Sequence, residues 1–387
     1  MSREIVRLDD PSDFDELMSV HDKAFGRDPG WFVELLPNTY QPTAECMARH
    51  YAVRESGRIV AALGAHPLRW HIGGRVLDIM GIGGVGTHPD WRKRGMMGGL
   101  LRHVVGEARQ RGFHLSWLGG QRQRYRRYGW ERAGAYLRID LSQANVRHEP
   151  TMQALPAVTF SPLAAATTTQ IARLNQWHDA QPMYCARGEE QFVGVLSNWR
   201  AQPQIAHDEQ GELIGYAVLD KEGESIIELV GRDLTAAQAM ARALVEQSEK
   251  GHMSVFCSPL PCELNRWLLA VGENATFTSM GNWQVFDWPE VVGALLAARH
   301  EAEPLAPGTV ALAVEGESRT LQLTVDGGQP HAEWSNVAPA MTLDAANIVR
   351  LLLGPLKPSH QMALTGSSAV LDAWCPLPAA IPHMDRV

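Results

Sequence analysis

The residues of this chain best suited to chemistry form a basic turn that contains a glycine. Three cationic side chains, Arg92, Lys93 and Arg94, precede Gly95, and a periodic apolar segment follows. A strand that turns here into a helix leaves unpaired backbone N–H groups at the helix N-terminus, where the helix dipole also favours negative charge. The turn is therefore expected to bind phosphate. A glycine beside basic residues is also common in a plain turn, so the flanking elements must decide between these two interpretations.

The segments on both sides of the turn have the spacing of a strand and a helix. Residues 76–85 indicate a strand with glycines, and a strand glycine often marks the close approach of a ligand or of another backbone. After the turn, apolar residues recur at helical spacing from Met97 to Ala108, which predicts a helix that runs to about Gln110. Gly112 ends this helix, and residues 113–118 predict the next strand. The order is thus strand, phosphate turn, helix and strand.

This segment resembles the pyrophosphate loop of the GNAT acyl-CoA N-acetyltransferase superfamily. The pattern R-x-x-G-x-(G/A) matches Arg92 and Gly95, whereas Met97 stands where the pattern has Gly or Ala. The resemblance implies acetyl-CoA as the co-substrate. The residues that it places against acetyl-CoA are Val85, Gly86, Thr87, Arg92, Lys93, Arg94, Gly95, Met96, Met97 and Gly98, together with Gly120 and Gln121 after the second strand.

Composition and charge describe a folded protein and limit its partners. The chain has 387 residues, 45% hydrophobic and 20% charged, so two or three domains are expected. A formal net charge of −8 argues against a general nucleic-acid binder. Ten arginines and lysines nevertheless gather between residues 92 and 127, where the phosphates of a CoA tail would be their natural partners.

Two further features predict the compartment. No apolar run is long enough to span a bilayer, and the N-terminal residues lack the apolar core of a secretory signal, so we expect a cytoplasmic protein with no membrane partner. The five cysteines are scattered and lack zinc-type spacing, and the histidines form no metal set. We therefore expect reduced structural cysteines and no metal.

The pattern of elements divides the chain into three expected domains, 1–140, 141–288 and 289–387. In the first, helices at 13–25 and 31–36 and hairpin strands at 50–54, 58–63, 67–72 and 75–82 precede the phosphate turn. The second alternates helix and strand signals but has no second R-x-x-G turn, so it is expected to be a scaffold or a wall of the substrate site. The third has strand signals at 309–314, 320–325 and 331–334, a helix from an N-cap at Thr342 through Leu353, and a proline-rich end.

The whole chain resembles the enhanced intracellular survival (Eis) family of acetyltransferases. The motif Y-x-R-(F/Y)-G-(Y/F) of that family matches Tyr125, Arg127, Tyr128 and Gly129, with Trp130 in place of the final ring. The resemblance implies an α+β and α/β fold with two GNAT-like mixed-sheet domains, the second without a cofactor, and a C-terminal sterol carrier protein-like α+β domain. It also implies a homo-oligomer such as a hexamer.

The resemblance also implies roles for particular residues. Tyr125 would be the general acid, and the α-carboxylate of Val387 would be the general base, with the tail docked at the active site. The alternatives are a surface tyrosine and a passive tail. Trp31, which follows Asp28, Pro29 and Gly30, lies in the region that lines the acceptor pocket in GNAT folds, so Trp31 and Asp28 are expected to contact substrate.

The sequence therefore predicts an acetyl-CoA-dependent N-acetyltransferase that acts on a primary amine, either a small molecule or a lysine-bearing acceptor. No G-x-S-x-G elbow offers a competing nucleophile. The alternative from another class is a lipid- or ligand-binding scaffold that uses the sterol carrier-like domain and keeps only a vestigial acyl-CoA site.

Overall fold

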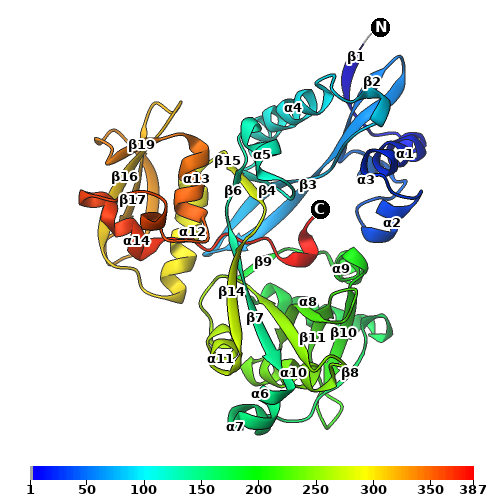
Figure 1. Ribbon diagram of the computed structural model, residues 1–387, viewed down its shortest axis with the longest axis vertical. Coiled ribbons are helices and arrows are strands. Elements are labelled where there is room, and N and C mark those ends of the chain that lie inside the picture. The colour runs from blue at the N-terminus through cyan, green and yellow to red at the C-terminus, as the bar shows by residue number, and fades with distance from the viewer. Residues whose placement is uncertain (1–2) are drawn as a thin grey trace.

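The computed structural model describes residues 3–387 and arranges them around three β-sheets, one in each part of the molecule (Figure 1). The first sheet has the strand order β1-β2-β3-β4-β5-β15-β6, with β9 beside β3. The second has the order β14-β7-β13-β12-β11-β10-β8, and the third the order β18-β17-β16-β19. These mixed sheets, with helices packed against them, confirm the predicted fold class.

The first unit surrounds the phosphate turn. Its strands are β1 (Arg3–Arg7), β2 (His50–Glu55), β3 (Arg58–Ile72), β4 (Arg75–Thr87), β5 (Leu115–Leu118), β6 (Glu131–Arg132), β9 (Met183–Cys185) and β15 (Asn282–Val285). Its helices are α1 (Phe14–Phe25), α2 (Trp31–Leu35), α3 (Ala44–Met47), α4 (Met96–Gln110) and α5 (Arg122–Tyr125). The predicted helix to Gln110 is confirmed. The expected break between strands at 63 and 67 is wrong, because β3 continues through Pro67 as one strand of 15 residues.

The centre of the first sheet opens at β4 and β5. These strands are parallel and pair only from Ile79 with Leu115 to Ile82 with Leu118, whereas β4 stays paired with β3 as far as Thr87. A bulge at Gly84, whose φ is +57°, shifts the register with β3 at this point. One edge of β4 beyond Ile82 therefore has no strand beside it within residues 3–387.

The second unit has the same strand connectivity as the first, with a parallel pair of strands joined by a helix. Its strands are β7 (Ala135–Ser142), β8 (Thr159–Pro162), β10 (Gln202–His207), β11 (Leu213–Leu219), β12 (Ser225–Gly231), β13 (His252–Cys257) and β14 (Asn274–Ser279). Its helices are α6 (Gln143–His148), α7 (Pro150–Gln153), α8 (Thr168–Asp179), α9 (Glu189–Leu196), α10 (Leu234–Gln247) and α11 (Glu263–Val271). The strands β12 and β13 are parallel, with α10 between them, as β4 and β5 are with α4.

Strands are exchanged between the parts of the chain. β9 and β15 lie within the expected second domain by sequence, yet β9 pairs with β3 and β15 pairs with β5 and β6 in the first sheet. The division at residues 140 and 288 stays a prediction, and these pairings show that the units are also joined by shared sheet.

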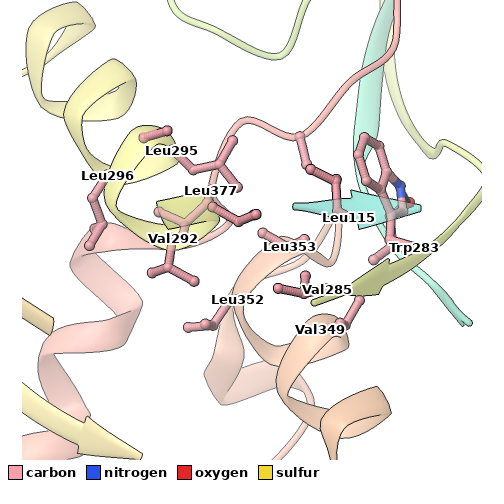
Figure 2. Packing of buried hydrophobic residues seen from close by; sticks show 14 of the residues in the cluster. Leu115, Trp283, Val285, Val292, Leu295, Leu296, Val349, Leu352, Leu353 and Leu377 are labelled. Atoms are coloured by element: carbon pink, nitrogen blue, oxygen red, sulfur yellow. Dashed lines mark hydrogen bonds between the residues drawn. The ribbon is translucent and has the colours of Figure 1, made fainter. Parts of the chain in front are cut away.

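The third unit packs on the first through two helices. Its elements are β16 (Gly308–Val314), β17 (Thr320–Val325), β18 (His331–Ser335), β19 (Met341–Leu343), α12 (Trp288–Ala302), α13 (Ala345–Leu353) and α14 (Leu371–Trp374). The expected N-cap at Thr342 is wrong, because residues 341–343 pair with β16 and Asp344 caps α13 instead. Apolar side chains of α12 and α13 contact Leu115, Trp283 and Val285 of the first sheet (Figure 2). Leu377 of the tail, the residues after α14 (375–387), packs among them.

In the part of the chain that the structure describes, none of the helices has the length and apolar character needed to traverse a bilayer.

Candidate active site

The basic turn opens α4 with unoccupied backbone donors. Gly95 is the N-cap of α4 and has a φ of +78°, a conformation that L side chains rarely adopt. No side chain caps this helix, and a Cβ on Gly95 would point into open space. The first N–H groups of α4 are therefore free to bind an anion from solvent.

Met97 and Gly98, in the first turn of α4, contact the interior. Met97, which departs from the family pattern, packs against the core between α4 and the sheet. A Cβ on Gly98 would lie 2.6 Å from the Tyr128 hydroxyl oxygen, so the absence of a side chain there lets Tyr128 lie against α4. The turn and the Tyr125–Trp130 segment are thus in contact.

Much of the basic cluster is paired within the protein. Arg92 donates a hydrogen bond to the Ala24 carbonyl over 2.7 Å. Arg122 and Arg126 both pair with Glu131, whose side chain is fully buried. Ligand phosphates are therefore not the partners of the whole run, because two of its arginines neutralise a buried carboxylate just beyond it.

Tyr125 lies at the end of α5, directly after β5. Its side chain is buried, and a Cβ on Gly120 would lie 2.9 Å from its Cε2 atom. Burial raises the pKa of Tyr125, although Arg124 opposes the shift. The phenol therefore stays protonated at neutral pH. Gln121, at the N-cap of α5, is exposed, and the Gly120 carbonyl accepts a hydrogen bond from the Asn282 side chain over 3.1 Å.

The last residue of the chain lies on the open part of β4. A Cβ on Gly83 would be 2.8 Å from the carboxyl carbon of Val387, and a Cβ on Gly81 would be 3.0 Å from a Val387 methyl. A Cβ on Gly83 would collide with the backbone of the chain end, and one on Gly81 would crowd its side chain. The terminal carboxylate therefore lies beside the strand that leads into the phosphate turn.

The path of the tail is fixed along its length. Leu377 N–H donates to the Leu352 carbonyl over 2.8 Å, and the Ala379 carbonyl accepts from Ala135 N–H over 3.0 Å. Ile381 and Met384 are fully buried. The tail thus crosses from the third unit, past the junction of the two large sheets, to β4 (Figure 1).

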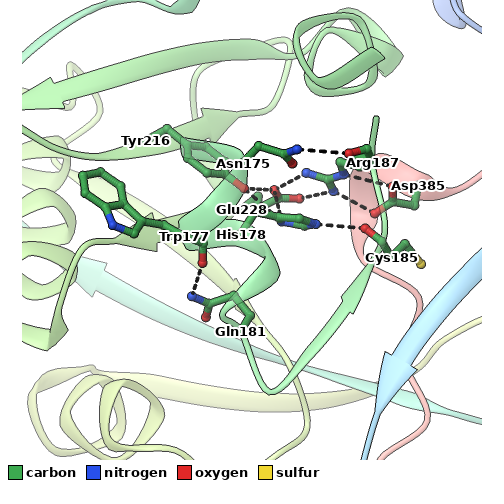
Figure 3. Close-up of polar contacts among 9 residues, drawn as sticks. All are labelled: Asn175, Trp177, His178, Gln181, Cys185, Arg187, Tyr216, Glu228 and Asp385. Carbon is green, nitrogen blue, oxygen red and sulfur yellow. Dashed lines mark hydrogen bonds and ion pairs between the residues drawn. The ribbon is translucent and has the colours of Figure 1, made fainter. Parts of the chain in front are cut away.

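A buried ion network holds the end of the tail on the second unit (Figure 3). Arg187 donates to Asp385 over 2.7 Å and to Glu228 of β12 over 2.6 Å, and its side chain is only 1% exposed. Tyr216 adds a 2.6 Å hydrogen bond to Glu228. Burial disfavours the charged form of Glu228, but the attraction of Arg187 outweighs it and lowers the pKa of Glu228 to about 2.

Replacement of this arginine should destabilise the protein. Arg187→Met is expected to lower the free energy of unfolding by about 3–5 kcal/mol, because it leaves two buried carboxylates without a counterion. Urea unfolding at pH 7 measures the change. The matched control is Arg200→Met, which removes an exposed ion pair with Glu34 and should cost at most about 1 kcal/mol.

The loss of stability in Arg187→Met should depend on pH. The pKa of Glu228 falls from an ordinary 4.5 to about 2 on folding, so its ionisation stabilises the native state above pH 4.5 and that contribution is lost as the pH falls towards 2. The difference in free energy of unfolding between wild type and Arg187→Met should therefore become smaller below pH 4.5. A difference that stays constant or grows would show that Arg187 does not act through this carboxylate.

The two residues expected to contact the acceptor, Asp28 and Trp31, lie where α1 leads into α2. Trp31 begins α2, is partly exposed, and has the Arg27 guanidinium 4.5 Å above its ring. Asp28 is exposed, and its carbonyl accepts from Trp31 N–H over 3.2 Å. Phe32 links this turn to His21 and Tyr40, with ring centroids 5.4 Å apart in both pairs. The structure therefore connects the two residues to β4 through an aromatic cluster.

Sequence reasoning missed a group of buried histidines beside the open part of β4. A Cβ on Gly84 would lie 2.6 Å from the Tyr40 hydroxyl and 3.0 Å from the His21 ring. His21, His50 and His66 follow one another at centroid distances of 6.3 and 5.4 Å. Both ring nitrogens of His21 and the Nε2 atoms of His50 and His66 are buried without a partner among the described residues. The three lie far apart in sequence, so spacing gave no signal.

These imidazoles are neutral at physiological pH. Burial lowers the pKa of His21 to about 3 and that of His50 to about 4, and it lowers the pKa of His66 as well. The region beside β4 therefore offers uncharged ring nitrogens next to the aromatic rings of Tyr40 and Phe32.

Comparison with known proteins gives a family match for the first unit. Residues 6–133 match the family described as "Acetyltransferase (GNAT) domain". No curated protein sequence matches the chain.

Among solved structures, the chain is similar over its whole length to a GCN5-related N-acetyltransferase from Kribbella flavida, with 20% identity, a TM-score of 0.71 and 100% of both chains covered. One from Anabaena variabilis has 17% identity and a TM-score of 0.68, with 98% of each chain covered. Eis1 from Mycobacterium abscessus has 15% identity and a TM-score of 0.68, covering 98% of this chain and 97% of that one. Residues 6–133 thus match a GNAT acetyltransferase domain, and the whole chain is similar in fold to these structures.

Proposed function

We propose that the protein is an acetyl-CoA-dependent N-acetyltransferase that acts on a primary amine. The observation that carries the proposal is the position of the Val387 carboxylate, on the open part of β4 within a GNAT acetyltransferase domain. A carboxylate delivered to that strand has an evident use as a proton acceptor beside the thioester.

The residues of the turn fit the phosphates of acetyl-CoA. The uncapped N-terminus of α4 presents backbone donors, and Gly95 leaves the approach open. Lys93 and Arg94 are exposed beside it. The free edge of β4 from Val85 to Thr87 can hydrogen-bond the amide groups of the pantetheine arm as a neighbouring strand would.

The chemistry assigns one proton transfer to each of two residues. The amine attacks the thioester carbonyl carbon, a C–N bond forms, the C–S bond breaks and the CoA thiolate leaves. The Val387 carboxylate accepts the proton that the acceptor's ammonium group must lose to become the attacking amine, and Tyr125 donates its phenolic proton to the thiolate. Burial keeps Tyr125 protonated, as this role requires.

The region beside β4 suits an amine acceptor. Neutral His21, His50 and His66 do not repel an ammonium group, and their unpartnered ring nitrogens can accept its hydrogen bonds, directly or through water. Trp31 and Asp28 would form the outer part of the acceptor site. A panel of amines that spans polyamines, aminoglycosides, lysine peptides and small metabolites, assayed by CoA release, tests the proposal. Absence of amine-dependent CoA release across the panel would count against it.

The scaffold alternative has a separate test. A lipid-binding protein with a vestigial site would not be stabilised by acetyl-CoA, whereas a ligand that binds only the native state must raise the melting temperature. The homo-oligomer, the sterol carrier protein-like character of the third unit and the cytoplasmic location stay predictions.

Substitution of Gly95 tests the cofactor turn with a matched pair. Gly95→Asp and Gly95→Asn impose the same backbone strain and nearly the same volume, but only Asp places a carboxylate at the anion site. We expect Asp to weaken acetyl-CoA binding at least about 10-fold more than Asn, because the new charge meets the pyrophosphate. Calorimetry on the folded variants measures this. Equal affinities for the two variants would remove the turn from the cofactor site.

A further inference from the structure

A cavity of about 670 Å³ lies in the second unit, away from the phosphate turn. It opens where β12 and β13 diverge, since these parallel strands pair only at Ser225 with Ser254 and Ile226 with Val255. The tail closes one side with Ala380–His383 and Arg386. The volume is within the range of about 300–1,000 Å³ that is usual for small-molecule sites.

This cavity is not a second phosphate site. It occupies the position in the second unit that the opening between β4 and β5 occupies in the first. The helix that follows, α10, is however capped by its own Asp233, whose carboxylate accepts from Ala236 N–H over 2.8 Å. A carboxylate already fills the position where α4 has free donors, so a phosphate would be repelled.

The walls of the cavity are mainly apolar. The two diverging strands supply Ile227, Leu229 and Phe256, and α11 and the tail supply Leu264 and Ile381. The link between β14 and β15 adds Met280. His383 also lines it, and burial, with Arg386 nearby, lowers the pKa of His383 to about 4, so this imidazole is uncharged at neutral pH. An apolar body would therefore be favoured inside.

Arg386 lies inside the wall and lacks a counterion among the described residues. The Arg386 guanidinium lies 5.7 Å from the centroid of the Tyr136 ring, and its Nε is buried with no hydrogen-bond partner in the described part of the chain. No carboxylate of residues 3–387 lies within ion-pair distance of it. Burial lowers the pKa of Arg386 only to about 10, so it remains charged at neutral pH. An unpaired, partly desolvated guanidinium attracts an anion strongly.

The other charged groups of the cavity are already paired or lie at its rim. Glu228 is held by Arg187, Asp233 caps α10 and pairs with Arg232, and Glu263 and Arg266 are exposed. Arg386 is therefore the buried charge of this wall that an anionic ligand could neutralise.

We propose that this cavity binds an amphipathic monocarboxylic acid, with the carboxylate on Arg386 and the apolar body between β12 and β13. Arg386 immediately precedes Val387, so such a ligand would also hold the end of the tail in place. The site is separate from the acetyl-CoA turn, and the inference does not depend on the proposed acetyl transfer.

The first test compares two probes that differ only in head-group charge. Decanoate, below its micellar concentration, and neutral decanamide are titrated into the full-length protein by calorimetry. We expect one decanoate to bind at least about 10-fold more tightly than decanamide, because a charge-assisted pair contributes more than a neutral hydrogen bond. Arg386→Met, which keeps the apolar stem, should bring the two affinities together, and Arg386→Lys should restore part of the difference.

The second test locates the probe. Cys262 lines the cavity and is partly exposed, whereas Cys46, Cys185 and Cys375 are buried and burial raises the pKa of Cys257 to about 12. Decanoate should slow the reaction of Cys262 with a maleimide. Leu264→Trp puts a larger side chain into the cavity and should abolish decanoate binding.

Equal affinities for decanoate and decanamide in the wild type, or an unchanged Cys262 labelling rate at saturating decanoate, would overturn the proposal. Labelling uses the wild-type chain, so it decides the matter even where Leu264→Trp fails to fold. Persistence of decanoate binding in Gly95→Asp would separate this site from the acetyl-CoA turn, and loss of binding there would place decanoate at the turn and refute the cavity.

Discussion

Removal of Arg386 and Val387 is expected to lower kcat for acetyl transfer at least about 10²-fold, while acetyl-CoA affinity changes little. The deletion takes away the carboxylate that lies over Gly81 and Gly83, but it leaves the turn at Gly95 and the anchor at Asp385 intact. A positioned acid or base contributes roughly 10²–10⁴-fold, and its correct placement is a large part of that effect. Steady-state CoA release and calorimetry with acetyl-CoA give the two quantities.

Three further variants separate the carboxylate from the side chain. Val387→Ala keeps the terminal carboxylate and should retain most activity. A short Gly-Ser extension moves the carboxylate away and adds bulk beside β4, so it should be as harmful as the deletion. Gly83→Ala places a Cβ 2.8 Å from the Val387 carboxyl carbon and should displace the chain end without any change in the tail sequence. Equal kcat/KM for the untagged and extended enzymes would refute the terminal-carboxylate mechanism.

Tyr125→Phe is expected to lower kcat by about 10²-fold or more, with nearly unchanged affinity for acetyl-CoA. The substitution removes only the hydroxyl from a buried ring, so the packing against Gly120 is kept and the proton donor is lost. Measurement at saturating amine and acetyl-CoA isolates kcat from substrate binding.

Tyr128→Phe is the matched control for this change. Tyr128 belongs to the same motif, but it packs on Gly98 of α4 and is only partly buried. Loss of its hydroxyl should have a small effect on kcat. If Tyr125→Phe kept full activity at saturating substrate, Tyr125 would have no part in proton transfer, whatever the effect at Tyr128.

The local elements of the cofactor turn could be predicted from sequence because their signals are local. The periodicity from Met97 to Ala108 fixed α4, and Gly95 and Gly112 marked its ends, as the structure confirms. Thr342 failed as a cap because a hydroxyl residue before a helical pattern also suits an edge strand, and pairing of Met341–Leu343 with β16 decided between the two.

The surroundings of the candidate site could not be predicted because they depend on contacts between distant residues. Arg187 meets Asp385 across 198 residues, and nothing near either residue indicates the pairing. His21, His50 and His66 come from α1, β2 and β3, and each alone would pass as an ordinary core or surface histidine. Arg122 and Glu131 are only nine residues apart, but their pairing still depends on how α5 and β6 are placed relative to one another.

The place of β15 in the first sheet has a consequence for how the chain emerges from the ribosome. Asn282 pairs with Leu118 across 164 residues. One edge of β5 therefore stays without its partner strand β15 until the whole of the middle unit has been synthesised. At about 5–20 residues per second, that interval is roughly ten to thirty seconds. Throughout it, the apolar strand Leu115–Leu118 has one unpaired edge, the kind of surface that invites aggregation. Nascent chains are therefore most vulnerable in this window, and a fragment that ends before residue 282 should need a chaperone or precipitate.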